Sequence, residues 1–139
     1  QDDKMAPYLE PLKDKLEEFL SIVDIKYLQE EERIYGVPVG FLRGASWTDK
    51  FVIVDEAQNM TEKELITIMT RVGENTRVFI CGDTMQSDIG NKSGFANIQN
   101  LFSCSASNDH GIYTFEFTVD DIIRSELVKF IVRKIKSLR

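Results

Sequence analysis

Two acidic residues at the end of an apolar run are the first candidates for chemistry in this sequence. Asp55 and Glu56 directly follow the run FVIV at residues 51–54. In an open parallel sheet, ligands bind at the carboxyl ends of the strands. Magnesium prefers oxygen ligands, so Asp55 could hold a metal ion while Glu56 orients an attacking water. An acidic pair after a strand is also commonly just the polar start of a loop, so the pair alone leaves both interpretations open.

A second polar cluster follows the next apolar run. The sequence GDTMQ at residues 82–86 comes directly after the end of the run VFIC. Gln86 could hydrogen-bond both an attacking water and a γ-phosphate, and Gly82 would let the backbone approach closely. The alternative is a Gly-Asp turn with an exposed glutamine. Because Asp83 and Gln86 follow the first cluster by about one helix and one strand, the pair of clusters is more specific than either alone.

Arg124 is the third candidate, just before the last predicted helix. A planar guanidinium suits a γ-phosphate, and an arginine finger can act within one chain or on a neighbouring subunit. The alternative is a surface arginine that pairs with Asp120 or Asp121. The residues by themselves favour the surface arginine.

Two residues before the first acidic cluster could contact single-stranded nucleic acid. Arg43 offers charge and Trp47 offers a ring for base stacking. Packing of Trp47 on the domain and an ion pair of Arg43 explain them equally well. A basic run at the end of the chain could also meet RNA, although a solvated helix is favoured because basic residues suit a helix C-terminus: Lys129, Arg133, Lys134, Lys136 and Arg139.

The elements that must position these residues follow from the hydrophobic pattern. The runs at 51–54 and 78–81 are short and rich in β-branched residues, as in parallel strands covered by helices. Thr61 followed by Glu64 is a capping box, which starts a helix that Gly73 ends. The other predicted elements are helices at 7–21, 25–32, 94–102 and 126–138, extended edge segments at 34–42, a polar loop at 103–111 and a strand at 112–117. Alternating strands and helices predict an α/β fold with a mainly parallel sheet.

Composition limits the class of protein. The 139 residues, 42% of them hydrophobic, suffice for one domain with a core. A net charge of −6 argues against a general polyanion binder. No apolar run approaches the roughly 18 residues of a membrane span, and no signal-peptide pattern opens the chain. Cys81 and Cys104 lack metal-ligand spacing, and Cys81 follows an apolar run where a buried thiol is ordinary. We therefore expect a soluble, cytoplasmic protein with no membrane partner.

A nucleotide-hydrolysing site also needs a phosphate-binding loop. That loop has the pattern G-x-x-x-x-G-K-[ST], and its backbone amides, Lys and Ser or Thr hold the phosphates and magnesium. The nearest fragment, GNKSG at residues 90–94, lacks the Gly-Lys pair. Six residues precede the first predicted helix, too few for a strand, a loop and a helix. We expect the first βα unit of such a fold to be missing from this chain.

Four segments, in order along the chain, resemble the PhoH-like family of phosphate-starvation-inducible ATPases. They are YLEPLKDKL at 8–16, VGFLRGASWTDKFVIVDEAQNMT at 39–61, RVFICGDTMQSDI at 77–89 and DIIRSELVKFIV at 121–132. The resemblance implies a P-loop NTPase with a RecA-like, mainly parallel sheet flanked by helices, related to the superfamily 1 helicase core. It also implies ATP and Mg²⁺ as cofactors. The whole chain would be a single partial domain, from Walker B to the arginine finger.

The resemblance assigns roles to the candidate residues. Asp55 and Glu56 would form Walker B, with Asp55 on the metal and Glu56 as a catalytic residue. The other implied roles are cofactor binding by Gln58, which completes the DEAQ box, a sensor motif at Asp83 and Gln86, and an arginine finger at Arg124 that acts across a ring of identical subunits.

Three departures from the family pattern stand beside this resemblance. Walker A is absent, Ala45-Ser46-Trp47 stands where Arg-Thr-Leu is frequent, and Ser125-Glu126 follows Arg124 where many members have His-Pro. Compact sequences with such changes also occur in bacteriophages. The first hypothesis is an ATPase core coupled to RNA unwinding or processing. The alternatives are a noncatalytic nucleic-acid-binding or assembly module, and a fragment of a superfamily 1 helicase, which is disfavoured because no second motor domain follows.

Overall fold

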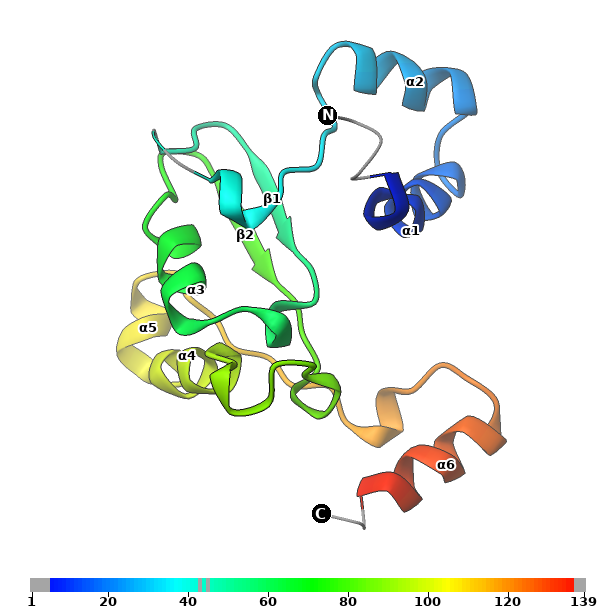
Figure 1. The fold of residues 1–139 in the computed structure, drawn as a ribbon, viewed down its shortest axis with the longest axis vertical. Helices are drawn as coiled ribbons and strands as arrows, with labels where there is room; N and C mark the ends of the chain where they lie inside the picture. Colours follow the sequence, from blue (N-terminus) through cyan, green and yellow to red (C-terminus); the bar gives the residue numbers. More distant parts are fainter. Residues whose placement is uncertain (1–5, 43, 45, 137–139) are drawn as a thin grey trace. The chain divides into compact units, whose positions relative to one another are not determined.

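The computed structural model describes residues 6–42, 44 and 46–136 (Figure 1). The chain divides into two compact units, Gln1–Phe95 and Ala96–Arg139. Asp55, Glu56, Gln58, Asp83 and Gln86 belong to the first unit, whereas Arg124 belongs to the second. Arg43, the candidate nucleic-acid contact, lies outside the described residues.

The first unit contains a two-stranded parallel sheet (Figure 1). Strand β1 (Phe51–Val54) pairs with β2 (Arg77–Ile80), and the register runs from Phe51 opposite Arg77 to Val54 opposite Ile80. The ladder continues past both strands, because the Cys81 amide donates to the Val54 carbonyl at 2.8 Å. Both predicted strands and their parallel arrangement are therefore confirmed, and the chain is an α/β protein.

Helix α3 (Glu62–Met69) connects the two strands, as a parallel pair requires. Thr61 caps it: the Glu64 amide donates to the Thr61 hydroxyl, and the Glu64 carboxylate accepts from the Thr61 amide at 2.8 Å. The predicted capping box is thus confirmed. Leu65 and Ile68 of this helix are fully buried. The helix ends at Met69 rather than near Gly73, because Val72 forms a parallel bridge with Trp47.

Two helices precede the sheet. Helix α1 (Ala6–Glu17) and helix α2 (Ile22–Glu30) confirm the predicted helical segments. Helix α2 begins three residues earlier than predicted, because the Ser21 hydroxyl accepts a hydrogen bond from the Asp24 amide and caps it. Ile25 is buried on the inner face of α2.

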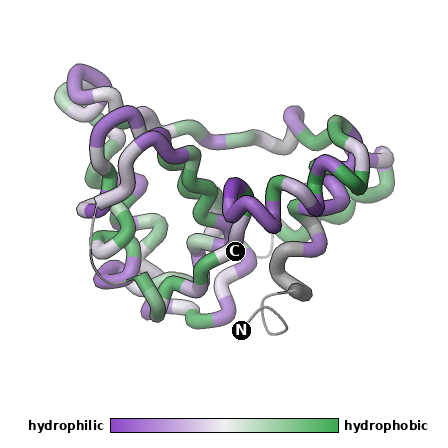
Figure 2. Tube along the Cα trace, turned by 90° about the horizontal axis from the view of Figure 1, so that it is seen from above, coloured by the Kyte–Doolittle hydropathy of each residue, from purple (hydrophilic) through white to green (hydrophobic). Residues whose placement is uncertain are grey.

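The predicted extended segments at 34–42 form no strand. Residues Val39–Phe41 make a 3-10 turn after Pro38, which has no amide to give to a sheet. Along the tube in Figure 2, hydrophobic and hydrophilic residues alternate in short stretches, as expected of helices with one apolar stripe each. No helix among the described residues is long and apolar enough to cross a membrane.

The second unit is helical. Helix α4 (Phe95–Phe102), which begins at the last residue of the first unit, confirms a predicted helix, as does α6 (Glu126–Lys136) within the described residues. The prediction of a polar loop at 103–111 was wrong in part, because α5 (Ser105–Asp109) forms there. The predicted strand at 112–117 was also wrong: this described segment pairs with no other strand. Its alternating pattern is real, but a strand exists only when a partner accepts its backbone hydrogen bonds.

Candidate active site at the ends of the two strands

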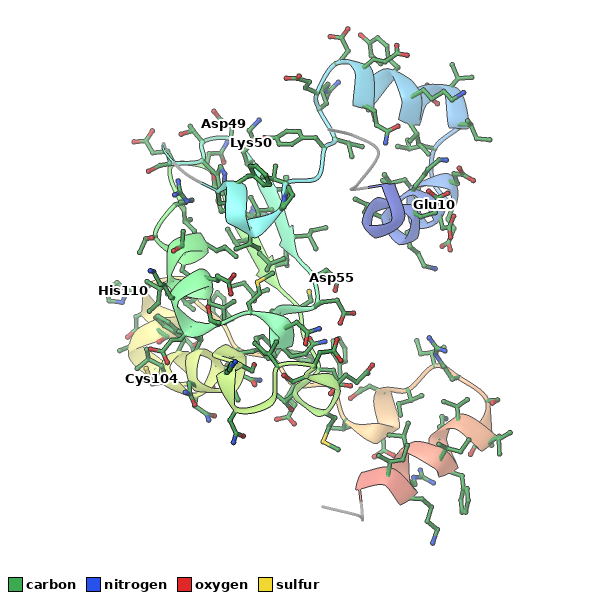
Figure 3. The ribbon with its side chains drawn as sticks, viewed as in Figure 1. Glu10, Asp49, Lys50, Asp55, Cys104 and His110 are labelled. Carbon is green, nitrogen blue, oxygen red and sulfur yellow. The ribbon has the colours of Figure 1, made fainter. Side chains whose placement is uncertain are left out.

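The two acidic clusters meet at one edge of the sheet. Because β1 and β2 are parallel and in register, Asp55 and Glu56 leave β1 beside the residues that leave β2. The Ala57 amide donates to the Cys81 carbonyl at 2.9 Å, which holds the two chain segments together beyond the strands. Figure 3 shows Asp55 at the carboxyl end of β1. The predicted juxtaposition of the two strand ends is therefore present.

The backbone turns sharply at Glu56. Its φ angle is +52°, in the left-handed region that a glutamate rarely adopts. The Glu56 amide donates to the Asp55 carboxylate at 2.9 Å, so the first acidic residue supports the turn at the second. Such a conformation costs about 1–3 kcal/mol and persists only where the surroundings hold it. The turn directs the Glu56 side chain to a specific partner.

That partner is Gln58, whose side chain is 1% exposed. Its Nε2 donates to Glu56 Oε2 at 2.5 Å, and its Oε1 accepts from the Asp83 amide at 3.0 Å. A buried amide must satisfy both its donor and its acceptor. Gln58 does so by joining the acidic cluster after β1 to the cluster after β2.

Gly82 is required because Gln58 fills the space beside it. A Cβ atom on Gly82 would stand 2.9 Å from Gln58 Oε1 and 3.0 Å from the Gln58 amide nitrogen. Both distances are shorter than ordinary carbon contacts. The close backbone approach expected at Gly82 therefore exists, and it is an approach to Gln58.

Asp83 organises the turn that carries Gln86. Its carboxylate accepts from the Met85 amide at 2.9 Å and from Gln86 Nε2 at 2.7 Å. These bonds cap the 3-10 turn Thr84–Gln86. Both Asp83 and Gln86 are exposed, so the turn presents an acidic and an amide side chain to solvent at the edge of the sheet.

Cys81 lies beside the same site and was not singled out by its sequence. The prediction of an ordinary buried thiol was wrong, because Cys81 is exposed to solvent and only its sulfur is partly covered. Partial desolvation of its sulfur raises the pKa of the Cys81 thiol, and the nearby negative charge of Asp55 raises it further. Cys81 is therefore a neutral thiol at the strand end near neutral pH. Only the pairing of β1 with β2 reveals its proximity to Asp55.

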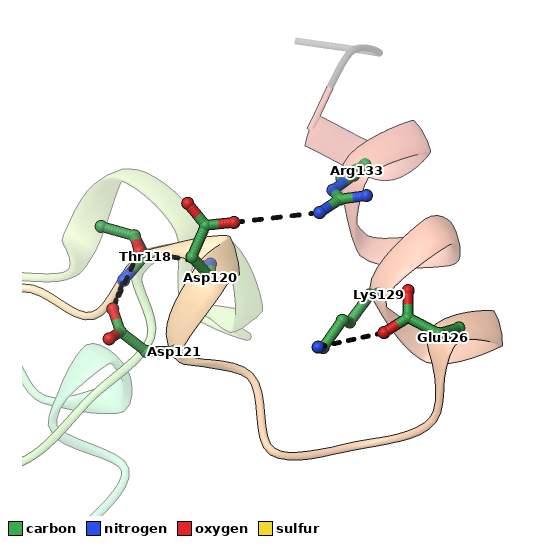
Figure 4. Close-up of polar contacts among 6 residues, drawn as sticks. All are labelled: Thr118, Asp120, Asp121, Glu126, Lys129 and Arg133. Atoms are coloured by element: carbon green, nitrogen blue, oxygen red, sulfur yellow. Dashed lines mark hydrogen bonds and ion pairs between the residues drawn. The ribbon is translucent and has the colours of Figure 1, made fainter.

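The acidic residues that could have paired with Arg124 have other partners (Figure 4). Asp120 lies 3.8 Å from Arg133, and the Asp121 carboxylate accepts from the Thr118 amide and hydroxyl. These hydrogen bonds lower the pKa of Asp121. Arg124 itself is exposed, and no ion pair joins it to either carboxylate within the described part of the chain. The surface-arginine alternative, as a pair with these residues, is not found.

Trp47 is fixed to the first unit through its backbone. Its amide donates to the Arg71 carbonyl at 2.7 Å, and its carbonyl accepts from the Thr76 hydroxyl at 3.1 Å. The residue is only partly exposed. The basic run at the chain end is partly neutralised, because Lys129 pairs with Glu126 at 3.1 Å and Arg133 pairs with Asp120.

One carboxylate is the predicted metal ligand. Across the described ranges 6–42, 44 and 46–136, no group of three or more His, Cys, Asp and Glu side chains is arranged to hold a metal ion. A magnesium ion bound with a nucleotide needs only one or two protein carboxylates, because phosphate oxygens and water complete its shell. Asp55, exposed at the end of β1, fits that kind of ligand set.

Comparison with known sequences decides the family. The sequence model of the family described as PhoH-like protein matches residues 1–136. The chain belongs to the PhoH-like family. This confirms the resemblance drawn from the four segments.

Three PhoH-like relatives similar to this chain are longer than it is. It is 36% identical over 131 residues to the PhoH-like protein of Synechocystis, and the aligned region covers 93% of this chain and 39% of the relative. It is 34% identical over 132 residues to the PhoH-like protein of Bacillus subtilis, covering 94% of this chain and 40% of the relative. It is 32% identical over 129 residues to Protein PhoH of Escherichia coli K12, covering 90% of this chain and 35% of the relative. The chain thus spans about two fifths of the length of these relatives.

Membership of the PhoH-like family leaves the individual roles as predictions. The structure brings together five of the predicted site residues, Asp55, Glu56, Gln58, Asp83 and Gln86. It places Trp47 elsewhere in the first unit and Arg124 in the second unit.

Proposed function

We propose that this chain is the part of a PhoH-like P-loop NTPase that carries the hydrolytic residues at the strand ends of a RecA-like sheet. The observation that carries the proposal is the bonded pair of strand ends. Glu56 after β1 and Asp83 after β2 are joined through the buried Gln58, so the two clusters form one site. A polar surface loop needs no such buried connection.

The roles follow from the chemistry of each group. Asp55 holds Mg²⁺ through an exposed carboxylate oxygen, and Glu56 orients and polarises the attacking water. Bound Mg²⁺ supplies charge neutralisation of the phosphates. Gln86, on the exposed turn Thr84–Gln86, would hydrogen-bond the γ-phosphate, and Arg124 would act as an arginine finger across the ring, on the charge that develops at the γ-phosphate of a neighbouring subunit.

The proposal includes coupling to RNA in a cytoplasmic ring of identical subunits. Its support is the family membership together with Arg43 and Trp47, which precede the site in the sequence. Trp47 is partly exposed and could stack on a base of a single strand. The net charge of −6 means that RNA would be held at a local surface rather than by the whole molecule.

The alternative function is a noncatalytic nucleic-acid-binding or assembly module. The motif G-x-x-x-x-G-K-[ST] supplies most of the phosphate contacts in P-loop NTPases, and these 139 residues do not contain it. A protein that kept these strand ends and had no such motif would fit this alternative.

Nucleotide binding separates the two functions. A fluorescent ATP analogue with Mg²⁺ is titrated into this chain and, as a positive control, into the full-length PhoH-like protein of Bacillus subtilis. Saturable, Mg²⁺-dependent binding to this chain supports the ATPase. Retention of single-stranded RNA by this chain, with no nucleotide binding either by it or by the longest natural form of the protein, supports the module.

Glu56→Gln tests the hydrolytic role in any form of the protein that hydrolyses ATP. The amide keeps the shape of the side chain but cannot act as a base, so turnover should fall by roughly 10²–10⁴-fold while nucleotide binding is kept. The matched control is Glu74→Gln, an exposed glutamate in the turn before β2, which should leave turnover unchanged. Equal turnover by wild type and the Glu56 variant would remove Glu56 from the mechanism.

A further inference from the structure

We propose that Gln58 is a positioning residue that couples the direction of the Glu56 carboxylate to the position of the turn at residues 83–86. The coupling itself is a property of the fold, and its catalytic consequence rests on the function proposed above. Gln58 is therefore assigned no contact with nucleotide, in contrast to the cofactor-binding role that the family resemblance implies for it.

The burial of Gln58 is the first support. Its side chain is 1% exposed, the only polar one among the four largest fully buried side chains of the described residues. A neutral amide out of contact with water costs free energy unless each of its polar atoms is paired. Here the amide nitrogen is paired with Glu56 and the amide oxygen with the backbone of Asp83. Neither bond is available to a ligand.

The chemistry of the two ends makes the choice of residue specific. One end must donate to a carboxylate and the other must accept from a backbone amide. Gln offers a donor and an acceptor on separate atoms of one neutral amide, and Asn, which offers the same pair, is one methylene shorter. Glutamate at this position would set a second carboxylate against Glu56, and methionine would keep the length while losing both bonds.

Neighbouring bonds make the connection stiff. The Ser87 hydroxyl donates to the Gln58 carbonyl at 3.0 Å, and the Asp88 amide donates to Asn59 Oδ1 at 2.8 Å. Together with the Gln58 side chain, these bonds join the turn Ala57–Asn59 to the segment at 83–88. Gly82 brings the backbone within reach, because any Cβ there would displace the Gln58 amide oxygen.

The consequence is mechanical. A ligand that moves the turn at 83–86 must also move or break the bond between the Asp83 amide and Gln58. Because the other end of the same amide holds Glu56, that carboxylate changes direction at the same time. A ligand bound to Gln86 would thus determine whether the Glu56 carboxylate points toward the attacking water.

The coupling is testable by NMR on the isotope-labelled chain, without nucleotide. Glu56→Ala removes the partner of Gln58 Nε2, and we expect a shift of the Asp83 amide and of the Gln58 side-chain NH₂ signals. In a Gln58→Met background, the same Glu56→Ala change should leave the Asp83 amide unmoved. The amides of Leu65 and Ile68, two buried residues of α3, report whether each variant is folded.

Two results would overturn the coupling. One is an Asp83 shift of the same size in both backgrounds, which would mean transmission by another route. The other is no change of the Asp83 amide and Gln58 NH₂ signals when Glu56 alone is replaced. This second measurement uses an exposed position and stays decisive even if Gln58→Met does not fold.

Kinetics separate the coupling from the proposed function. If the chain hydrolyses ATP, Gln58→Met should lower kcat and leave KM for ATP unchanged, because Gln58 touches no substrate. A raised KM with unchanged kcat would instead indicate direct contact with ATP and overturn the positioning role. If the NMR coupling is present and no nucleotide binds, the proposed ATPase fails while the mechanical link stands.

Discussion

At the scale of single residues, Glu56 shows how a fold prepares a side chain for chemistry. A glutamate with φ of +52° is held there by the Asp55 carboxylate on one side and by Gln58 on the other. The sequence DEAQ predicted that these residues act together. The sequence could not show that the backbone turns at Glu56 in a left-handed conformation, or that a buried Gln58 holds the Glu56 carboxylate. Both features depend on the segment around Asp83, 25 residues after Gln58.

Gly82 gives a prediction at the same scale. Gly82→Ala should destabilise the protein by about 1–3 kcal/mol, because the new methyl overlaps the Gln58 amide in a packed site. The measurement is urea unfolding followed by circular dichroism. Gly40→Ala is the matched control, since nothing lies within 4 Å of a Cβ there, and it should stay within about 0.5 kcal/mol of wild type. Equal stability of the two variants would contradict the packing described at Gly82.

At the scale of elements, local signals were reliable where the chain supplies its own partners. Helix α3 starts after Thr61 as predicted, because its cap and its Glu64 are three residues apart. The segment at 112–117 has an equally clear alternation and forms no strand. A helix satisfies its backbone within itself, whereas a strand depends on a second strand that the local sequence does not contain.

The cap of α3 can be tested directly. Thr61→Ala removes the hydroxyl that accepts from the Glu64 amide and should cost about 1 kcal/mol of stability at neutral pH. Urea unfolding measures it. Thr67→Ala on the same helix is the control, because the Thr67 hydroxyl donates only to the Lys63 carbonyl, which the helix bonds anyway. A cost shared equally by both variants would contradict a specific capping role.

The same cap gives a pH dependence. Hydrogen bonds from the Thr61 amide and hydroxyl lower the pKa of Glu64 in the folded chain. The ionised Glu64 carboxylate therefore stabilises the folded chain fully above the ordinary glutamate pKa of about 4.3. This stabilisation is lost as the pH falls through the lower pKa that Glu64 has in the folded chain. The difference in stability between wild type and Thr61→Ala should shrink over that acidic range. A difference that stays constant from neutral pH to about pH 3 would show that the Thr61 hydroxyl does not help to lower the pKa of Glu64, since the Ala variant keeps the backbone amide that also donates to this carboxylate.

At the scale of the whole molecule, close contacts join segments that lie far apart in the sequence. Thr61 forms an antiparallel bridge with Ser93, and the Gly94 amide donates to the Met60 carbonyl at 2.9 Å. A Cβ on Gly94 would stand 2.3 Å from the Glu62 backbone. The segment that leads into α4 can therefore approach the start of α3 only through a glycine.

Gly94→Ala should be more damaging than any other substitution predicted here. Because the overlap is with backbone rather than with a movable side chain, we expect a loss of about 3 kcal/mol or more. Thermal unfolding compared with Gly40→Ala measures it. A variant as stable as the control would show that the α3 start and Gly94 are farther apart than described.

The sequence by itself determined the family, the α/β class, the two parallel strands and the helix between them. It did so because hydrophobic runs, the Thr61 cap and the motifs at 55–58 and 82–86 are local signals. The tertiary structure alone decided that Gln58 is buried between Glu56 and Asp83, that Cys81 lies beside Asp55, and that the described segment 112–117 joins no sheet. These depend on distances between segments, which pairing and packing set and which local sequence patterns do not contain.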